Sequence, residues 1–335
     1  MKLDAEQIKK ISTGAVRIEE ENGEVRLYRF TKEQIELYEN VKQDLYMKRF
    51  ATSGIKLSFK TNSKNLFIKI NAEIGSSRKY FSVDVFVDGK CIGYIDNFSA
   101  LELPADYTKL ELPLGEFSKD FYLGEGEKKV CVHMPWSTNT SIKEIAIDEG
   151  AFIEEVKPSK KLLAYGDSIT QGYDAIRPSN RYISKLADIL DAQEFNKAIA
   201  GEVFFPELAM TKDPFVPDYI TVAYGTNDWS KTDRETFKKN CKAFYTSISQ
   251  NYPDTKIFAI TPIWRKDMCE EREFGDFNKV EEDIREIVKD IENITVIKGF
   301  DFVPKDENYY ADLRLHPNDK GFEYYVKSLC DKINI

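Results

Sequence analysis

Residues 162–170, Leu-Leu-Ala-Tyr-Gly-Asp-Ser-Ile-Thr, form an apolar run that stops abruptly at a glycine and two polar residues. Residues 162–164 predict a short buried strand, and Gly166 permits a sharp turn after it. A serine at the carboxyl end of such a strand lies where an open α/β sheet binds ligands and where the N–H groups of the next helix point outward. Ser168 is therefore a candidate nucleophile. The alternative is that Asp167 and Ser168 only cap the following helix, and this segment alone does not separate the two.

The chain contains two histidines, His133 and His316. A serine hydroxyl is a weak nucleophile and needs an adjacent base, most often histidine. His133 lies in an alternating strand pattern where no neighbouring residue completes a site, so we interpret it as a half-buried structural histidine. His316 precedes the last amphipathic helix, which Asn318 can cap. His316 is thus the candidate base.

Two other apolar segments end in small or polar residues. The strand predicted for Tyr219–Tyr224 is followed by Gly-Thr-Asn-Asp, and the amide of Asn227 could donate a hydrogen bond to a developing oxyanion. Gly, Asn and Asp also form turns, so an ordinary turn is the alternative. Gly201 directly follows Ile199 and Ala200, and a glycine there would let a backbone N–H approach a substrate closely.

Taken together, Ser168, Gly201, Asn227 and His316 resemble the GDSL/SGNH hydrolase family, whose name letters are Ser, Gly, Asn and His. The order and rough spacing of the four blocks match, and the resemblance covers about residues 158–335. It implies that Ser168 attacks an ester carbonyl and that His316 takes the serine proton. It also implies an oxyanion hole formed by the N–H groups of Ser168 and Gly201 and by the Asn227 side chain.

The third member of a catalytic triad does not stand at the family's usual position. The family usually places its acid three residues before the histidine, and in this chain Leu313 occupies that position. Asp312 lies four residues before His316, and a loop with one extra residue could still bring its carboxylate to the histidine ring. The alternative is a Ser–His dyad in which a backbone carbonyl holds the histidine tautomer, because orientation is the main task of the acid. We favour Asp312, since a carboxylate also stabilises the imidazolium that forms.

The second half of the chain predicts a flavodoxin-like doubly wound α/β domain, because strand patterns alternate with helical ones. The predicted strands are Lys161–Tyr165, Glu194–Ile199, Tyr219–Tyr224, Lys256–Thr261 and Ile294–Ile297. One of the intervening helices contains Phe237 and Phe244, and a capping box at Thr232 and Glu235 is expected to start it. The predicted catalytic domain spans residues 158–335.

The first half predicts an antiparallel β-sandwich of jelly-roll type over residues 1–157. Short strand patterns recur there between turn signals, including the hairpin dipeptides Asn22-Gly23 and Asp88-Gly89. The predicted strands are Ile55–Phe59, Leu66–Ile70, Phe81–Val87, Ile92–Ile95, Lys109–Leu112, Lys129–Met134 and Ile142–Ile147. Some carbohydrate-acting SGNH esterases, and a related acyltransferase, carry a sandwich domain ahead of the hydrolase domain, and this chain resembles that arrangement.

Composition limits the possible partners. A formal net charge of −9 argues against nucleic acid and anionic membrane, which select basic surfaces. The first residues lack the apolar core of a signal peptide, and no stretch is long enough to span a bilayer. Five scattered cysteines without CxxC spacing suit reduced thiols in the cytoplasm and offer no zinc site. No phosphate-binding glycine loop appears, so we expect no nucleotide cofactor. With no zinc site either, we expect no metal. The sequence does not determine the oligomeric state.

Three aromatic residues near the predicted catalytic edge, Trp264, Trp229 and Tyr173, are candidates for lining a sugar-binding cleft, although burial is an equally good interpretation. Asp228 and Asp319 are expected to be scaffold or helix-terminal residues and not catalytic ones. The expected function is a serine esterase that removes short acyl groups, above all acetyl, from a carbohydrate or similar polar substrate. An acyltransferase using the same residues is one alternative, and a non-catalytic carbohydrate-binding protein is another.

Overall fold

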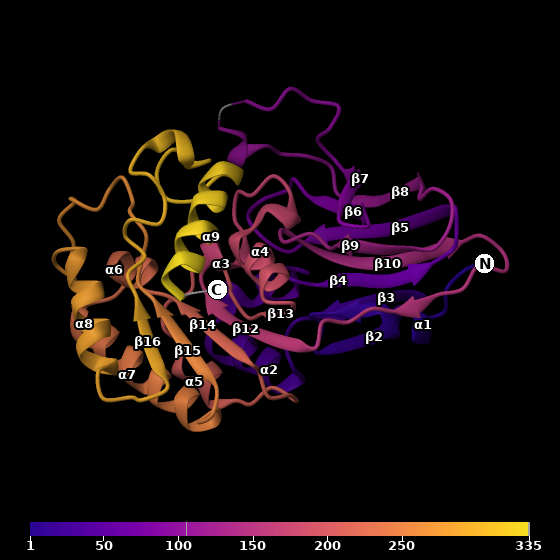
Figure 1. The fold of residues 1–335 in the computed structure, drawn as a ribbon. Helices are drawn as coiled ribbons and strands as arrows, with labels where there is room; N and C mark the ends of the chain where they lie inside the picture. Colours follow the sequence, from indigo (N-terminus) through magenta and orange to yellow (C-terminus); the bar gives the residue numbers. More distant parts are fainter. Residues whose placement is uncertain (105, 334–335) are drawn as a thin grey trace.

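Two antiparallel sheets and one parallel sheet form the protein, and Figure 1 shows the sandwich on one side and the parallel sheet with its helices on the other. The computed structural model describes residues 1–104 and 106–333. The predicted fold class is confirmed: an N-terminal β-sandwich precedes an α/β domain. The strand predicted at Lys109–Leu112 is wrong, because a 3-10 turn occupies Tyr107–Lys109 and the next strand begins only at Gly115.

The sandwich buries apolar side chains between its two sheets. One sheet has the order β2 (Arg17–Glu21), β3 (Glu24–Tyr28), β10 (Thr138–Ile147), β5 (Asn65–Ile74) and β8 (Gly115–Tyr122). The other has the order β1 (Ser12–Thr13), β4 (Lys56–Thr61), β9 (Lys128–His133), β6 (Ser82–Val87) and β7 (Lys90–Asp96), and β11 (Glu154–Glu155) also pairs with β4. Helix α1 (Ala5–Ile11) packs beside β4 and β11. Both hairpin dipeptides have the positive φ angles that such tight turns need: Asn22 and Gly23 join β2 to β3, and Asp88 and Gly89 join β6 to β7.

The α/β domain is built on a parallel sheet whose strand order, β13-β12-β14-β15-β16, is the flavodoxin-like order 2-1-3-4-5. Its strands are β12 (Lys160–Gly166), β13 (Ala192–Asn196), β14 (Tyr219–Ala223), β15 (Lys256–Ile260) and β16 (Ile294–Ile297). The helices are α3 (Ser168–Gln171), α4 (Tyr182–Ile189), α5 (Pro206–Met210), α6 (Thr226–Lys231), α7 (Arg234–Asn251), α8 (Asn278–Val288) and α9 (Asp319–Ile333).

Alternation along β12 explains why helices cover both faces of this sheet. Leu162 and Ala164 pack with α4 and α9, whereas Leu163 and Tyr165 pack with α7 and α8. Because both faces are buried, the strand is apolar without interruption, and this is why its end could be recognised in the sequence.

Helix α7 starts one residue later than its predicted cap. The N-cap is Asp233, whose carboxylate accepts the N–H of Thr236 at 2.8 Å, so the capping box predicted at Thr232 and Glu235 is wrong. Thr232 instead donates its hydroxyl to the carbonyl of Asp228. A carboxylate competes well for this position, because it is as good an N-cap as a hydroxyl.

The two halves share more than a linker. Helix α2 (Lys32–Val41) and the 3-10 helix at Gln43–Phe50 come from the N-terminal half, yet Phe30, Tyr38 and Leu45 belong to the same apolar cluster as the parallel sheet. The division at residues 157 and 158 stays a prediction, and residues 334 and 335 of the predicted second domain lie outside the described residues. Part of the N-terminal half therefore builds the core beneath the catalytic edge.

Candidate active site

Ser168 lies at the end of β12 and is the first residue of α3. Asp167 caps α3 by accepting the N–H of Ile169 at 3.0 Å, as the capping alternative predicts, but Ser168 also faces a histidine. Gly166 is needed for space, because a Cβ there would come within 2.4 Å of the Thr170 hydroxyl oxygen. The tight passage from strand to helix leaves the serine side chain at the edge of the sheet.

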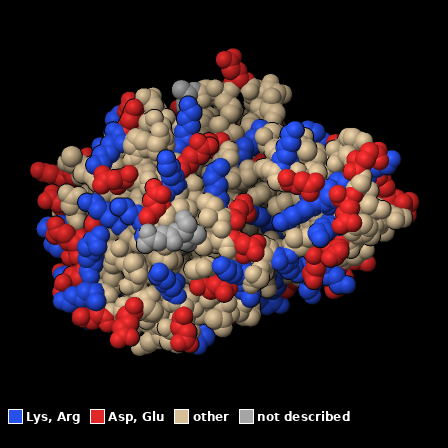
Figure 2. All heavy atoms as spheres, viewed as in Figure 1, with Lys and Arg blue, Asp and Glu red and all other residues tan. Residues whose placement is uncertain are grey.

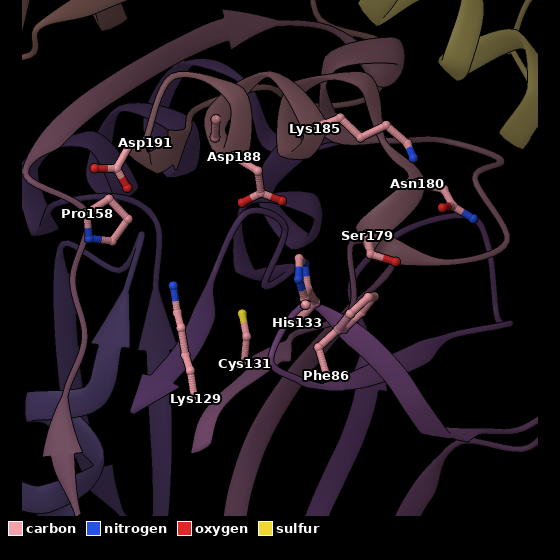
Figure 3. A pocket seen from close by; sticks show the side chains of 12 residues that line it. Phe86, Lys129, Cys131, His133, Pro158, Ser179, Asn180, Lys185, Asp188 and Asp191 are labelled. Atoms are coloured by element: carbon pink, nitrogen blue, oxygen red, sulfur yellow. The ribbon is translucent and has the colours of Figure 1, made fainter. Parts of the chain in front are cut away.

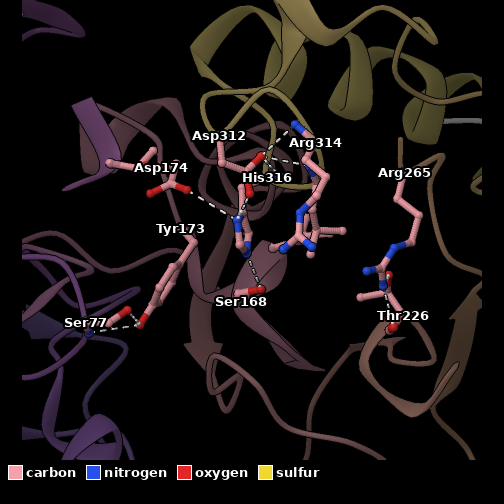
Figure 4. Close-up of polar contacts among 12 residues, drawn as sticks. Ser77, Ser168, Tyr173, Asp174, Thr226, Arg265, Asp312, Arg314 and His316 are labelled. Atoms are coloured by element: carbon pink, nitrogen blue, oxygen red, sulfur yellow. Dashed lines mark hydrogen bonds and ion pairs between the residues drawn. The ribbon is translucent and has the colours of Figure 1, made fainter. Parts of the chain in front are cut away.

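Three side chains form a continuous hydrogen-bonded line at this edge (Figure 4). The Ser168 Oγ lies 2.8 Å from Nε2 of His316, and Nδ1 of the same ring lies 2.7 Å from Oδ2 of Asp312. The ring can therefore carry its proton on Nδ1, facing the carboxylate, and accept the serine proton at Nε2. The expected contact between Asp312 and the histidine ring is therefore present. In the dyad alternative, a backbone carbonyl would be the partner of Nδ1, and here that partner is the Asp312 carboxylate.

The extra residue between Asp312 and His316 is accommodated by Leu313, which has a φ of 55°. This left-handed conformation is uncommon for a residue with a branched side chain. The other oxygen of Asp312, Oδ1, accepts the backbone N–H groups of Arg314, Leu315 and His316 at 3.0, 2.7 and 3.0 Å. These bonds fold the longer loop back so that the carboxylate still reaches the ring.

The charge state of Asp312 follows from its partners. Burial alone would raise the pKa of this carboxyl, but hydrogen bonds from the His316 ring and from the N–H groups of Leu315 and His316 lower the pKa well below its usual range. Asp312 is thus a carboxylate at neutral pH, the form that stabilises an imidazolium.

The two further oxyanion candidates lie on loops that follow β13 and β14. Gly201 has a φ of 87°, and its carbonyl accepts the Lys231 ammonium at 2.6 Å. Within the described residues, the Gly201 N–H donates to no acceptor. Asn227 is the second residue of α6 and donates one amide N–H to the carbonyl of Glu202 at 3.0 Å. Because a primary amide has two N–H donors, that bond fixes the side chain and leaves a second donor.

Asp228 and Asp319 both act as scaffold residues. Asp228 accepts the N–H of Phe204 at 3.1 Å, and burial raises its pKa to about 7. Asp319, at the start of α9, accepts from the N–H of Ile176 at 2.9 Å and from the Asn180 amide at 2.7 Å. Its pKa is raised to about 6 by burial. These bonds tie the loops around the site to its helices.

The proposed substrate aromatics are not equivalent. Trp229 is 1% exposed and donates its indole N–H to the carbonyl of Gly275, so it belongs to the core and cannot present a face to a sugar. Tyr173 is 3% exposed, and its ring packs beside the ring of His316, with centroids 5.6 Å apart. Tyr173 therefore packs against the histidine and does not line an open cleft. Trp264 is half-buried against Tyr310, and its role in binding stays a prediction.

Sequence reasoning missed a second carboxylate at the histidine. Oδ2 of Asp174 lies 3.3 Å from Nδ1 of His316, and the Asp174 side chain is completely buried. Asp174 belongs to the loop after α3, where the sequence offers no signal of its role. Its partner Arg78 lies 96 residues earlier, between β5 and β6 of the sandwich. Only the packing of the two halves brings these groups together.

Asp174, Asp312 and His316 are the group of possible metal ligands found among the described residues, with ligand atoms within 4.8 Å of one another. Each of these side chains already has a protein partner, because the ring bridges Ser168 and Asp312 while Asp174 pairs with Arg78. We interpret the group as a hydrogen-bonded network.

Two hollows lie near or between the domains. An open groove of about 600 Å³ begins at Asp312 and is lined by Lys266, Asp267, Cys269, Glu270, Asp312, Leu313 and Arg314. A second cavity of about 460 Å³ lies between β9 and α4, and contains none of the predicted catalytic residues (Figure 3).

His133 lines that cavity and is 6% exposed, and burial lowers its pKa well below the usual range. It is more deeply buried than predicted, and it lies on the sandwich and not beside Ser168.

Charges of both signs are interspersed over the face of the molecule shown in Figure 2. No helix in the described part of the chain is long and apolar enough to cross a membrane.

Residues 164–324 match the GDSL-like lipase/acylhydrolase family. The chain therefore contains a GDSL-like acylhydrolase domain, preceded by a β-sandwich region. No curated protein sequence matches the chain.

Solved structures share the whole architecture at low sequence identity. A salicylyl-acyltransferase from a tetracycline biosynthetic pathway is 21% identical with a TM-score of 0.79, covering 96% of this chain and 93% of its own. A protein from Bacteroides ovatus described as a GDSL-like lipase is 20% identical with a TM-score of 0.77, covering 100% and 97%. A family two carbohydrate esterase from Clostridium thermocellum, solved with cellohexaose, is 16% identical with a TM-score of 0.64, covering 85% and 93%. At these identities the likeness establishes the fold alone.

Proposed function

We propose that this protein is a serine esterase that hydrolyses short acyl esters, acetyl esters above all, on a carbohydrate or similar polar substrate. The observation that carries the proposal is the line of contacts from Ser168 through His316 to Asp312, with heavy-atom distances of 2.8 and 2.7 Å. A nucleophile, a base and an orienting acid at these distances are the requirements of acyl transfer through a serine.

In the proposed reaction, the Ser168 oxygen attacks the ester carbonyl while Nε2 of His316 takes the hydroxyl proton. The carbonyl oxygen becomes negative, and the N–H groups of Ser168 and Gly201 and the free amide N–H of Asn227 would donate to it. The histidine then gives its proton to the departing alcohol, which leaves an acyl-serine. A water molecule, activated by the same histidine, releases the acid and restores the serine hydroxyl.

A polar substrate is supported by the charges beside the site. The groove that begins at Asp312 is lined by Lys266, Asp267, Glu270 and Arg314. Such a surface can hydrogen-bond hydroxyl groups, whereas a long acyl chain requires an apolar lining. The fold shared with a carbohydrate esterase solved with cellohexaose agrees with this choice.

An acyltransferase is the second candidate, and the likeness to the salicylyl-acyltransferase over 96% of this chain favours it. The same residues would form the acyl-serine, but an acceptor alcohol would replace water in the second step. The two reactions differ in how well the acyl-enzyme is shielded from water.

The test is turnover of 4-nitrophenyl acetate by the full chain, with and without a sugar or alcohol acceptor, followed by a screen of acetylated sugars. Release of acetate at a rate independent of the acceptor supports the esterase. Formation of a new ester at the expense of acetate supports the acyltransferase. Sugar binding without turnover of any ester would contradict both and favour a non-catalytic carbohydrate-binding protein.

We also propose that the protein acts in the cytoplasm, since its five cysteines are all free thiols. Fractionation of the producing cells would test this, and recovery of the protein outside the cytoplasm would contradict it.

A further inference from the structure

An ion pair connects the sandwich to the proposed active site. The Arg78 guanidinium donates to both carboxylate oxygens of Asp174, from Nε at 2.6 Å and from a terminal nitrogen at 2.9 Å. The Tyr80 hydroxyl also donates to Asp174 at 2.8 Å, and the Tyr107 hydroxyl donates to its backbone carbonyl at 2.6 Å. All three donors come from the N-terminal half. Asp174 itself has a φ of 70°, an uncommon conformation that these contacts hold in place.

This buried carboxylate lies on the same side of the imidazole as Asp312. Nδ1 of His316 is 2.7 Å from Asp312 and 3.3 Å from Asp174, so two negative groups face one ring nitrogen. Two negative carboxylates beside each other repel. The bidentate bond from Arg78 offsets the charge of the second one, Asp174.

We propose that Asp174 and Arg78 are positioning residues for His316, through which the sandwich domain completes the catalytic site. The inference rests on the proposed function. Asp312 and Asp174 together orient the ring, and their two charges stabilise the imidazolium that forms when Ser168 gives up its proton. Arg78 sets how much of the Asp174 charge the ring experiences. With a neutral ring the four groups sum to −1, and with an imidazolium they sum to zero.

Other charged groups near the ring are few among the described residues. Asp167 interacts electrostatically with His316 across the site, and burial raises its pKa to about 6. Arg314 is directed to Asp267, at 3.3 Å. Because these groups are untouched in the variants below, differences between variants report on the Arg78–Asp174 pair.

The experiment compares Asp174→Asn, Arg78→Met and Arg78→Lys in the full chain. The first readout is the pKa of the His316 imidazole by NMR, which is favourable because the chain has only two histidines. Asp174→Asn removes a negative charge and should lower that pKa by about one unit, whereas Arg78→Met uncovers the Asp174 charge and should raise it by a similar amount. Arg78→Lys keeps the charge and should give a value close to that of the unchanged protein.

The second readout is ester turnover. Asp174→Asn should reduce kcat roughly ten- to a hundredfold, the usual loss when the partner of a functional histidine is removed, with a much smaller change in KM. The acid limb of the pH profile of kcat should move to lower pH in Asp174→Asn and to higher pH in Arg78→Met, as the NMR pKa values do. Arg177→Met is the matched control, since Arg177 also joins the halves, through Asp96 at 2.5 Å and Ser82 at 2.8 Å, and makes no contact with His316 among the described residues.

The inference is supported if the His316 pKa shifts in opposite directions in Asp174→Asn and Arg78→Met and does not shift in Arg177→Met. Shifts of the same sign, or none, would overturn it and leave Arg78 as an interdomain clamp only. Failure of the proposed function itself would give a different result: Ser168→Ala would keep its full esterase activity.

Discussion

The Ser168 hydroxyl oxygen and Nε2 of His316 lie 2.8 Å apart although 148 residues separate them in the chain. Ser168 follows β12, an interior strand of the parallel sheet, and His316 belongs to the loop that leads into α9. Helix α9 packs over the sheet face that Leu162 and Ala164 present, so the core beneath the site fixes this distance.

The first prediction is that Ser168→Ala abolishes ester hydrolysis and leaves the fold intact. Removing a triad nucleophile costs roughly a million-fold in turnover, because only binding and oxyanion stabilisation remain. Release of 4-nitrophenol measures the rate, and circular dichroism checks the fold. Substantial activity in a well-folded variant would reject the mechanism.

Asn227→Ala should lower kcat by roughly a hundred- to a thousandfold, as expected for the loss of one oxyanion donor. KM should change much less, because the bond strengthens only as charge develops on the carbonyl oxygen. The matched control is Asn308→Ala, since the exposed Asn308 side chain donates to the Asp306 carboxylate on the surface. A rise in KM at constant kcat would make Asn227 a binding residue instead.

Asp312→Asn tests the triad. We expect kcat to fall by roughly ten-thousand-fold, because an amide at this position favours the wrong tautomer of His316. A fall in kcat of tenfold or less would favour the dyad, because a backbone carbonyl would then still orient His316 and only a secondary contact would be lost. His316→Ala should be severely impaired in either case, and it sets the lower limit of the assay.

A buried acid outside the triad predicts how stability depends on pH. Burial raises the pKa of Glu202 to about 8, and the Tyr224 hydroxyl donates to its carboxyl at 3.0 Å. The folded state therefore keeps a proton that the unfolded state releases at a lower pH. Since the folded state binds more protons between about pH 5 and pH 8, the free energy of unfolding should fall as the pH rises through this range.

Glu202→Gln should remove much of this dependence, because a neutral amide can still accept from Tyr224. Urea denaturation at pH 5 and pH 8 should give a smaller difference in this variant, by roughly 1–3 kcal/mol. The exposed Glu207 on α5 provides the control Glu207→Gln, which should keep the original dependence. An unchanged dependence in Glu202→Gln would show that other groups cause it.

Local patterns in the sequence determined the class of fold and most of the candidate site. An uninterrupted apolar strand ending at Gly166 marks a sheet buried on both faces, and the polar residues at such strand ends gather at one edge. Ser168, Gly201 and Asn227 could be named for this reason, since each directly follows a strand or apolar segment. His316 could be named because the only other histidine lies in the sandwich.

The tertiary structure alone decided which groups surround the histidine. Leu313 adopts a left-handed conformation so that Asp312 still reaches the ring, and spacing in the sequence left this open. Asp174 and Arg78 carry no local signal, because their contact depends on how the sandwich packs against the α/β domain. The sequence left open whether Trp229 lines a cleft or is buried, and it is buried in the core. Strand and helix periodicity records which face of an element is buried, whereas contacts between distant segments arise only when separate elements pack together.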